Sequence, residues 1–388
     1  MTTASPATGT EDIMPDITPR GFTLDDPSLY RDSSFIDGAW VDGTGSQRID
    51  VTNPADGSVI ATFSILGPEG ARKAVDAADA AFGPWSLLLP QERTAILRRW
   101  YDLVIEAKED LARIMVLEQG KPISEARGEI DYGASFIEFF AEEARRPDIM
   151  SVTSHLPSAE VEVWREPVGV AALVTPWNFP IAMLTRKAAA ALAVGCTVVA
   201  HPSKETPISA LALAVLAERA GFPKGVLNIA VGEPAPIVGE WTKDNRVRAL
   251  SFTGSTEIGR LLYKQCAPTI KRLSLELGGH APFIVFADAD METAVTEAIK
   301  AKFATSGQDC LGANRFYVER PVYEDFCARF AERTKALTIG FGLDHPPVDD
   351  PGAPIGRERV AIALFAVIMF ALSFTPVPIS PMDFVGQR

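Results

Sequence analysis

The sequence predicts an α/β fold organised around a doubly wound parallel sheet. From residue 168 onward, short apolar runs without polar alternation each precede a stretch with helical character. Apolar strands separated by helices indicate parallel strands that are covered on both faces. The composition supports a substantial core, because 47% of the residues are hydrophobic and 22% are charged. At 388 residues, the chain is long enough for two or three domains.

The first part of the chain precedes this alternation. Residues 1–32 are polar and rich in Pro and Thr, so they are expected to form a disordered tail. Short strands are expected at 35–41 and 49–54, with Asp-Gly turn signals nearby. Three helices are expected next, at 68–82, 90–117 and 123–145. The alternating residues 160–164 predict an exposed strand.

The alternating part then follows in order. Strands are expected at 168–174, 197–200, 226–231 and 249–252, and the helices that follow them at 181–194, 208–220, after Pro236, and 256–266. Ligands of such sheets bind at the carboxyl ends of the strands. The loops at 175–180, 201–204 and 253–255 are therefore the expected binding loops.

A cysteine lies in a short loop late in the chain. Cys310 follows an amphipathic run at 291–303 and precedes a strand-like segment at 314–318. A loop cysteine is more often inert than nucleophilic, so this position alone is a weak signal. Two further residues strengthen it: Glu276, a carboxylate that can activate water, and Asn178, a side-chain amide that can bind an oxyanion. The three together suit attack of a thiol on a carbonyl.

Several function classes are disfavoured by composition. A net charge of −13 argues against nucleic-acid binding, since phosphates would be repelled. The four cysteines form no CxxC pair and no HExxH occurs, so no metal site is expected. The first residues resemble neither a secretory signal nor a transit peptide. These features predict a soluble protein of the reducing cytoplasm.

The motifs resemble those of the aldehyde dehydrogenase superfamily, and most closely its succinate-semialdehyde dehydrogenase branch. They occur in family order at residues 117–122, 176–180, 252–259, 275–279 and 307–310, and the resemblance runs from about Phe35 to Leu343. It implies a Rossmann-like NAD(P)-binding domain at 33–275, with a projecting oligomerisation hairpin at about 151–167. A partial catalytic domain at 276–345 and a non-family apolar tail at 346–388 are expected to follow.

The resemblance also implies roles for individual residues. Cys310 would be the nucleophile and Glu276 the base, while Asn178 and the Cys310 backbone N–H would form the oxyanion hole. An aldehyde would be oxidised through a thiohemiacetal and a thioester. The implied cofactor-binding residues are Thr175, Pro176, Trp177, His201, Ser203, Lys204, Gly232, Gly254, Ser255 and Leu277.

Some positions depart from the family pattern. His201 replaces a cation that contacts the adenosine ribose, and Lys204 stands where relatives carry a residue such as an acid. Either NAD or NADP is expected as cofactor, with NADP slightly favoured, because His201 and Lys204 could pair with a 2′-phosphate. Asp309 replaces a threonine and should raise the pKa of the thiol. Ala304 replaces an arginine that grips the substrate carboxylate. Arg186 remains either as a substrate-binding residue or as a helix-surface residue.

The end of the chain leaves alternatives open. After Leu343 the segment that holds the nicotinamide ribose and the last oligomerisation strand are expected to be missing, although the family forms homo-oligomers. Residues 360–379 are apolar and long enough for a membrane span, but two prolines favour a foreign tail on a truncated chain. The leading hypothesis is an NAD(P)-dependent enzyme that oxidises a small semialdehyde. The alternatives are an impaired remnant that binds a nucleotide or a homologous subunit, and a membrane-tethered protein.

Overall fold

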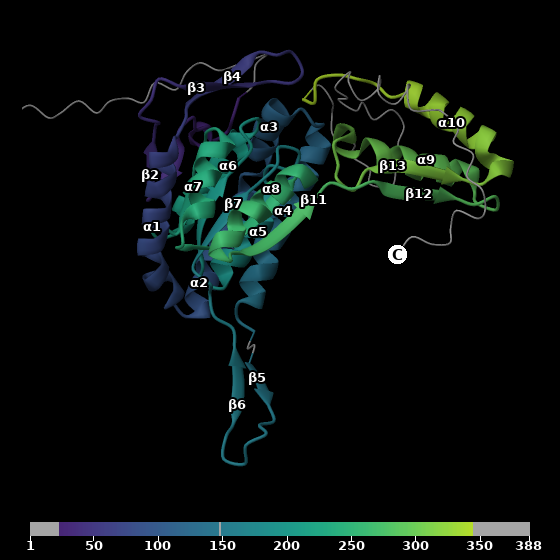
Figure 1. Ribbon diagram of the computed structural model, residues 1–388. Helices are drawn as coiled ribbons and strands as arrows, with labels where there is room; N and C mark the ends of the chain where they lie inside the picture. Colours follow the sequence, from purple (N-terminus) through teal and green to yellow (C-terminus); the bar gives the residue numbers. More distant parts are fainter. Residues whose placement is uncertain (1–22, 147–148, 344–388) are drawn as a thin grey trace, which may run out of the picture.

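A computed structural model describes residues 23–146 and 149–343. Its centre is a seven-stranded sheet with the order β11-β10-β7-β8-β9-β1-β2 (Figure 1). Strands β11, β10, β7, β8 and β9 are parallel, whereas β1 runs antiparallel to both β9 and β2. Their bounds are β1 Ser34–Ile36, β2 Ala39–Val41, β7 Val170–Val174, β8 Thr197–His201, β9 Leu227–Ile229, β10 Val247–Gly254 and β11 Arg272–Leu277. The expected doubly wound α/β fold is confirmed.

Helices cover both faces of this sheet, and each face has its own core. The core of one face contains residues of α2 (Pro90–Glu106), α3 (Lys108–Gln119), α4 (Ile123–Glu143), α5 (Ala182–Ala193) and α6 (Pro207–Ala220). The other core contains residues of α1 (Pro68–Ser86), α7 (Pro234–Lys243) and α8 (Thr256–Cys266). Every residue of β7 and β8 is buried between them. Both strands are mainly apolar, apart from Thr197 and His201 at the two ends of β8, because neither face meets water.

Two expectations for the first part of the chain are wrong. The helix expected at 90–117 is two helices, because Ala107 leaves helical geometry at φ −85° and ψ 10°. The tail expected at 1–32 is folded from residue 23 to 32, where a short 3₁₀ helix (η2, Pro27–Leu29) places Leu29 in the core. The carboxylate of Asp110 holds this segment by accepting hydrogen bonds from the backbone N–H groups of Asp25 and Asp26. Residues 1–22 lie outside the described part of the chain.

Two small antiparallel sheets lie beside the main one. Strands β3 (Arg48–Thr52) and β4 (Val59–Ser64) form the first, and β5 (Ile149–Val152) and β6 (Val161–Trp164) form a hairpin that projects from the body (Figure 1). The hairpin exposes large apolar side chains, with Met150 58% and Trp164 64% exposed. It occupies the region in which a projecting hairpin was expected.

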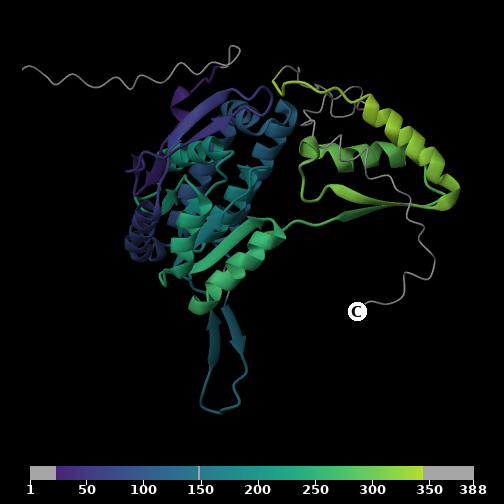
Figure 2. The same cartoon turned by 45° about the horizontal axis from the view of Figure 1, so that its top comes forward.

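A smaller unit follows β11. It consists of β12 (Ala281–Val285), β13 (Ala313–Val318), α9 (Met291–Phe303) and α10 (Tyr323–Lys335), with the short 3₁₀ helices η4 (Ala304–Gly307) and η5 (Arg320–Val322). A further 3₁₀ helix, η3 (Ala267–Thr269), lies earlier in the chain, between α8 and β11. The two strands are parallel, and the helices share a separate core with them (Figure 2). After α10 the chain returns to the larger unit, where Phe341 joins its core and the Gly342 carbonyl accepts a hydrogen bond from the Ile123 N–H.

The apolar segment expected at 360–379 lies outside the described residues. Within 23–146 and 149–343, none of the helices has the length and apolarity needed to cross a membrane.

Candidate active site

Asn178 lies in the loop between β7 and α5, at the carboxyl end of a buried strand. Its side-chain amide donates a 2.8 Å hydrogen bond from Nδ2 to the backbone carbonyl of Gln308. Gln308 is separated from Cys310 by one residue, so the amide and the thiol come from units far apart in sequence and meet at one place. The amide is therefore positioned beside the loop that carries the cysteine.

The loop before Cys310 has an unusual backbone. Thr305, Ser306 and Gly307 follow one another with φ of 51°, 56° and 75°. The left-handed region costs non-glycine residues about 1 kcal/mol or more each, and strain of this kind persists where the surroundings impose it. Thr305 and Ser306 are buried, so packing of their side chains offsets part of that strain. The following turn closes through a hydrogen bond from the Leu311 N–H to the Asp309 carboxylate.

Cys310 is exposed at the surface of this turn. Partial burial of the sulfur, the neighbouring Asp309 carboxylate and, more weakly, Glu276 raise the pKa of the thiol above its ordinary value. The effect expected of Asp309 from the sequence is thus present, although burial is the larger cause. The influence of Glu276 indicates that its carboxylate faces the same region. At neutral pH the thiol is protonated, so a nearby group must remove its proton during attack.

Glu276 is the penultimate residue of β11 and is paired in register with Thr253 of β10. A third group, Lys187 of α5, faces this carboxylate and was missed in the sequence. Burial lowers the pKa of Lys187 to about 8, while Glu276 acts in the opposite direction. The amine donates a 3.0 Å hydrogen bond to the hydroxyl of Ser251. No local motif marks Lys187, because its partners come from strands more than sixty residues away.

The expected cofactor residues lie at the carboxyl ends of the parallel strands β7, β8, β9, β10 and β11. The Thr175 N–H donates to the His201 carbonyl at 3.1 Å, which joins the first two loops. The buried Thr175 hydroxyl has no hydrogen-bond partner within the described part of the chain. Next to it, Pro176 is half-buried and Trp177 is 39% exposed. An unpaired buried hydroxyl at this edge suits a polar ligand.

One expectation for this edge is wrong. His201 is buried, with its Nδ1 2.9 Å from the Ala230 carbonyl, and burial lowers the pKa of the imidazole. At neutral pH it is therefore uncharged, and it cannot act as the cation that the sequence suggested for a 2′-phosphate. The cause is its position as the last residue of a strand covered on both faces.

Lys204 and Ser203 lie in the next turn of the same loop. The Lys204 amine forms an ion pair with Glu233 at 3.1 Å, and both side chains are partly exposed. The Ser203 hydroxyl donates to Glu205. Gly232, just before Glu233, has no room for a side chain, since an added Cβ would lie 2.7 Å from the Leu66 carbonyl oxygen. An anionic ligand could therefore bind the Lys204 amine by displacing Glu233 from the ion pair.

The third loop leads into α8. Ser255 caps this helix by accepting a 3.3 Å hydrogen bond from the Ile258 N–H, and Gly254 ends β10 directly before it. Leu277 packs close to Gly259 in the first turns of α8. A helix N-terminus presents N–H groups and positive potential to phosphate. Together with the unpaired Thr175 hydroxyl, this set of donors fits a dinucleotide such as NAD or NADP.

The substrate residue expected at Arg186 is half-buried on α5, with its guanidinium 5.2 Å from the centre of the Phe136 ring. Its charge is close enough to lower the pKa of the neighbouring Lys187. It is therefore more enclosed than an ordinary helix-surface residue. Ala304, the other position considered, begins η4 directly before the strained loop.

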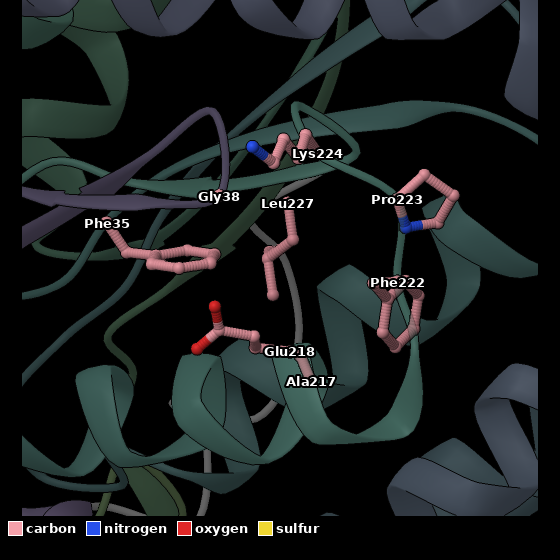
Figure 3. A pocket seen from close by; sticks show the side chains of 8 residues that line it. All are labelled: Phe35, Gly38, Ala217, Glu218, Phe222, Pro223, Lys224 and Leu227. Atoms are coloured by element: carbon pink, nitrogen blue, oxygen red, sulfur yellow. The ribbon is translucent and has the colours of Figure 1, made fainter.

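Two other features lie apart from this site. A pocket of about 190 Å³ lies at the amino end of β9, between the end of α6 and the turn after β1, where Lys224 and Glu218 are among its lining residues (Figure 3). The catalytic loops lie at the opposite ends of the strands. Among the described residues, no group of three or more His, Cys, Asp or Glu side chains is arranged to hold a metal ion.

Comparison with known proteins shows the family of the chain. The aldehyde dehydrogenase family profile matches residues 40–357, and the chain belongs to that family. A non-phosphorylating aspartate-semialdehyde dehydrogenase of Halomonas elongata is 53% identical over 83% of this chain and 65% of the relative. The NADP(+) succinate-semialdehyde dehydrogenase of Escherichia coli is 49% identical, over 88% and 72%. A crystal structure of a Brucella melitensis aldehyde dehydrogenase matches with a TM-score of 0.83 and 49% identity, over 90% and 70%.

The chain thus spans about two thirds of the length of the curated relatives it matches. The matched region extends past Leu343, where the resemblance was expected to end, to residue 357.

Proposed function

We propose that this chain oxidises a short semialdehyde, such as succinic semialdehyde, to its carboxylic acid with NAD or NADP. The observation that carries the proposal is the hydrogen bond from Asn178 to Gln308, which brings the amide donor to the Cys310 loop while Glu276 acts electrostatically on the thiol. A nucleophile, an oxyanion donor and a base from three distant segments suit attack on an aldehyde carbonyl.

The first step is attack by the Cys310 sulfur on the aldehyde carbon. Because its pKa is raised, the thiol must lose its proton to a nearby acceptor, and the two carboxylates that act on it are Asp309 and, more weakly, Glu276. The carbonyl oxygen then becomes an oxyanion. The Asn178 amide can exchange the Gln308 carbonyl for this oxyanion and, with the Cys310 N–H, stabilise it. Loss of one such donor typically lowers the rate by about 100- to 1000-fold.

The cofactor supplies a hydride acceptor when bound. Thr175, Ser203, Lys204 and the start of α8 at Ser255 are the groups proposed to hold it, with Pro176, Trp177, Gly232, Gly254 and Leu277 forming the surrounding edge. Their donors suit a ribose and a pyrophosphate. His201 supports β8 instead, through its contact with the Ala230 carbonyl.

The last step releases the acid from Cys310. Glu276 is proposed to take a proton from water as the water attacks the thioester. Lys187 lies beside this carboxylate with a lowered pKa of about 8. At neutral pH the amine is mainly protonated and offers a positive charge next to Glu276.

We propose NADP as the slightly preferred cofactor, because Lys204 is a cation next to the loop that follows β8. The support is weaker than the sequence suggested, since His201 is neutral and Lys204 is paired with Glu233. Titration of NAD and NADP against the chain and against Lys204→Glu tests this. Loss of NADP affinity in the variant, with NAD affinity retained, is expected. A clear NAD preference of the unchanged chain would contradict it.

The names of the relatives, which give aspartate semialdehyde and succinate semialdehyde, support the proposed substrate class. Both carry a carboxylate, which needs a cation when it is desolvated. Arg186 is the proposed cation, since its half-buried guanidinium lies on α5 one residue from Lys187. Arg186→Ala is expected to lower kcat/KM for succinic semialdehyde much more than for butanal. An equal loss for both aldehydes would remove Arg186 from the substrate site.

The alternative is a protein that binds a nucleotide or a homologous subunit without efficient chemistry. The raised pKa of the Cys310 thiol, which lowers the thiolate fraction, favours this alternative. Cofactor reduction with a panel of aldehydes separates the two. Reduction that disappears in Cys310→Ala supports the oxidation, whereas cofactor binding with no reduction supports the alternative.

We also propose a cytoplasmic homo-oligomer. All four cysteines are unpaired thiols, as in a reducing compartment. The apolar side chains exposed on the β5–β6 hairpin are suited to contact with another subunit. Sedimentation of the intact chain and of Trp164→Glu tests the second point.

A further inference from the structure

A buried ion pair lies below the loop that carries Asn178. Lys121, just after α3, and Glu129, on α4, form it, and each side chain is 1% exposed. Removing two charges from water costs several kcal/mol per ion, roughly, and such a pair is tolerable only with further hydrogen bonds. The remaining partners of the two groups therefore indicate what the pair holds.

Those partners lie between Asn178, in the loop after β7, and Ala182, the first residue of α5. The Glu129 carboxylate accepts hydrogen bonds from the N–H groups of Ile181 and Ala182, at 3.0 and 3.1 Å. The Lys121 amine donates to the backbone carbonyl of Asn178 at 3.0 Å. The same amine lies 4.4 Å from the centre of the Phe179 ring, within cation–π range. The pair thus fixes the backbone at Asn178 and the backbone three residues later.

Lys121 is itself held in place. Its N–H donates a 2.9 Å hydrogen bond to the side chain of Gln119, and Gly120 before it adopts φ 88°, a conformation that favours glycine. Gly342 lies against it, since a Cβ added there would be 2.4 Å from the Lys121 carbonyl oxygen. The Lys121 side chain therefore starts from a fixed backbone position, from which its ammonium group contacts the Asn178 carbonyl.

We propose that Lys121 and Glu129 are positioning residues for the oxyanion donor. When the backbone carbonyl of Asn178 is held in place, the backbone of that residue is fixed. The direction in which its Nδ2 amide points toward the Cys310 loop is then fixed as well. This inference rests on the role proposed above for Asn178. It predicts that the pair acts on formation of the tetrahedral oxyanion.

A neighbouring carboxylate, that of Glu118, provides an example of helix capping by itself. Glu118, at the end of α3, accepts hydrogen bonds from the Ile208 and Ser209 N–H groups of α6 at 2.8 and 2.9 Å. Glu129 makes the equivalent contacts with α5, but the ammonium of Lys121 extends the contact to a catalytic residue. A capping role alone would not require that extension.

The main experiment measures the pre-steady-state burst of cofactor reduction with succinic semialdehyde. Lys121→Met keeps the length of the side chain and removes the donor. We expect the burst rate to fall by about 10- to 100-fold, the size of effect that small misplacement produces. The matched control is Lys108→Met, which removes the partly exposed ion pair between Lys108 of α3 and Asp131 of α4. The control burst is expected to stay within about threefold of the unchanged chain.

A double-variant cycle identifies the route of the effect. If Lys121 acts through Asn178, Lys121→Met should lower the burst by less than about threefold in an Asn178→Ala background. An equal reduction in both backgrounds would overturn the proposal. If Asn178→Ala alone leaves the burst unchanged, the role proposed for Asn178 fails, and with it the inference. If Asn178→Ala lowers the burst rate but Lys121→Met does not, the inference is overturned and the role proposed for Asn178 stands.

A second measurement does not need turnover. Amide hydrogen exchange in a peptide covering 175–182 should accelerate at least about tenfold in Lys121→Met and remain unchanged in Lys108→Met. The combined variant Lys121→Met with Glu129→Gln keeps an acceptor for the helix N–H groups without a buried unpaired charge, so it serves if the single variant fails to fold. Unchanged exchange of 175–182 in that folded variant would overturn the proposal, whatever the activity.

Discussion

The strands that carry Asn178 and the strands beside Cys310 differ in how they are packed. All residues of β7 and β8 are buried, between two separate cores. In β12, buried or half-buried residues alternate with exposed ones, and β13 has exposed residues near its start. Their single core lies toward α9 and α10 and is rich in phenylalanine. The large unit is thus covered on both faces and the small unit on one.

This difference divides the catalytic groups between two environments. Asn178, Glu276 and Lys187 belong to elements of the large unit, whereas Cys310 belongs to a strained loop of the small one. Regions with few buried contacts open locally at a lower free energy than the core of a domain. The nucleophile is therefore expected to be the more mobile partner of the reaction.

The largest expected effect concerns the nucleophile. Cys310→Ala should abolish aldehyde oxidation, because Cys310 is the thiol in the loop that the Asn178 amide contacts. Replacement of Cys196, Cys266 or Cys327 by alanine should leave the rate of aldehyde oxidation within a few-fold of that of the unchanged chain. Spectrophotometric cofactor reduction measures both. Residual oxidation in Cys310→Ala would mean that the chemistry does not belong to the small unit.

The second prediction concerns the two cores. Phe330 is buried and stacks against Phe326 in the small unit, so Phe330→Ala should destabilise that unit by about 3–5 kcal/mol. Hydrogen exchange should then accelerate in β12, β13, α9 and α10 and stay slow in β7 and β8. Leu213→Ala, in α6, should have the reverse pattern. Uniform acceleration in both variants would show that the units unfold together.

The third prediction concerns Glu276. Glu276→Gln should lower steady-state turnover by about 100-fold or more, since general-base catalysis contributes that much. The rate of cofactor reduction in the burst phase should remain higher than the steady-state rate that follows it. Stopped-flow absorbance resolves the two phases. If the burst disappears as well, Glu276 is required for thiol attack and not only for hydrolysis.

The smallest effect concerns the charge beside the thiol. Asp309→Asn should lower the pKa of Cys310, because the carboxylate is one of the groups that raises it. Thiolate forms as pH rises through the pKa, so the alkylation rate of Cys310 should begin to rise at a lower pH in the variant. Mass spectrometry of iodoacetamide labelling measures this. Asp288→Asn, beyond the opposite end of β12, is the control and should leave the profile unchanged.

Local sequence signals predicted the regular elements well. The bounds of α8 and α9 coincide with those expected, and Gly120 ends α3 in the left-handed conformation. The break at Ala107 was missed because no Gly or Pro marks it. The fold of residues 23–32 was missed because the burial of Leu29 depends on partners such as Asp110, far away in the sequence.

The candidate site residues could be identified from the sequence where a motif carries them, and their roles stay predictions. Asn178, Glu276 and Cys310 lie in motifs, and the structure brings their segments together. Lys187 and Glu129 lie outside these motifs, and the motif at 117–122 that contains Lys121 suggested no role for it. Their roles arise from contacts between elements. The error at His201 has a similar cause, since the sequence shows a histidine but not its burial beside the carbonyl of Ala230.

The small unit is attached to the large one at both of its ends. The chain leaves through Gly278 and Gly279, where an added Cβ would meet no atom within 4 Å, and it returns at Phe341 and Gly342. A rigid body attached at two points keeps one free motion, which is rotation about the line that joins them. The hydrogen bond from Asn178 to Gln308 is a further attachment that restrains this rotation. Small-angle scattering with and without a bound aldehyde analogue would detect such a rotation. An oxyanion that takes the Asn178 amide would release the restraint, so we expect the same event that begins the chemistry to let the small unit turn.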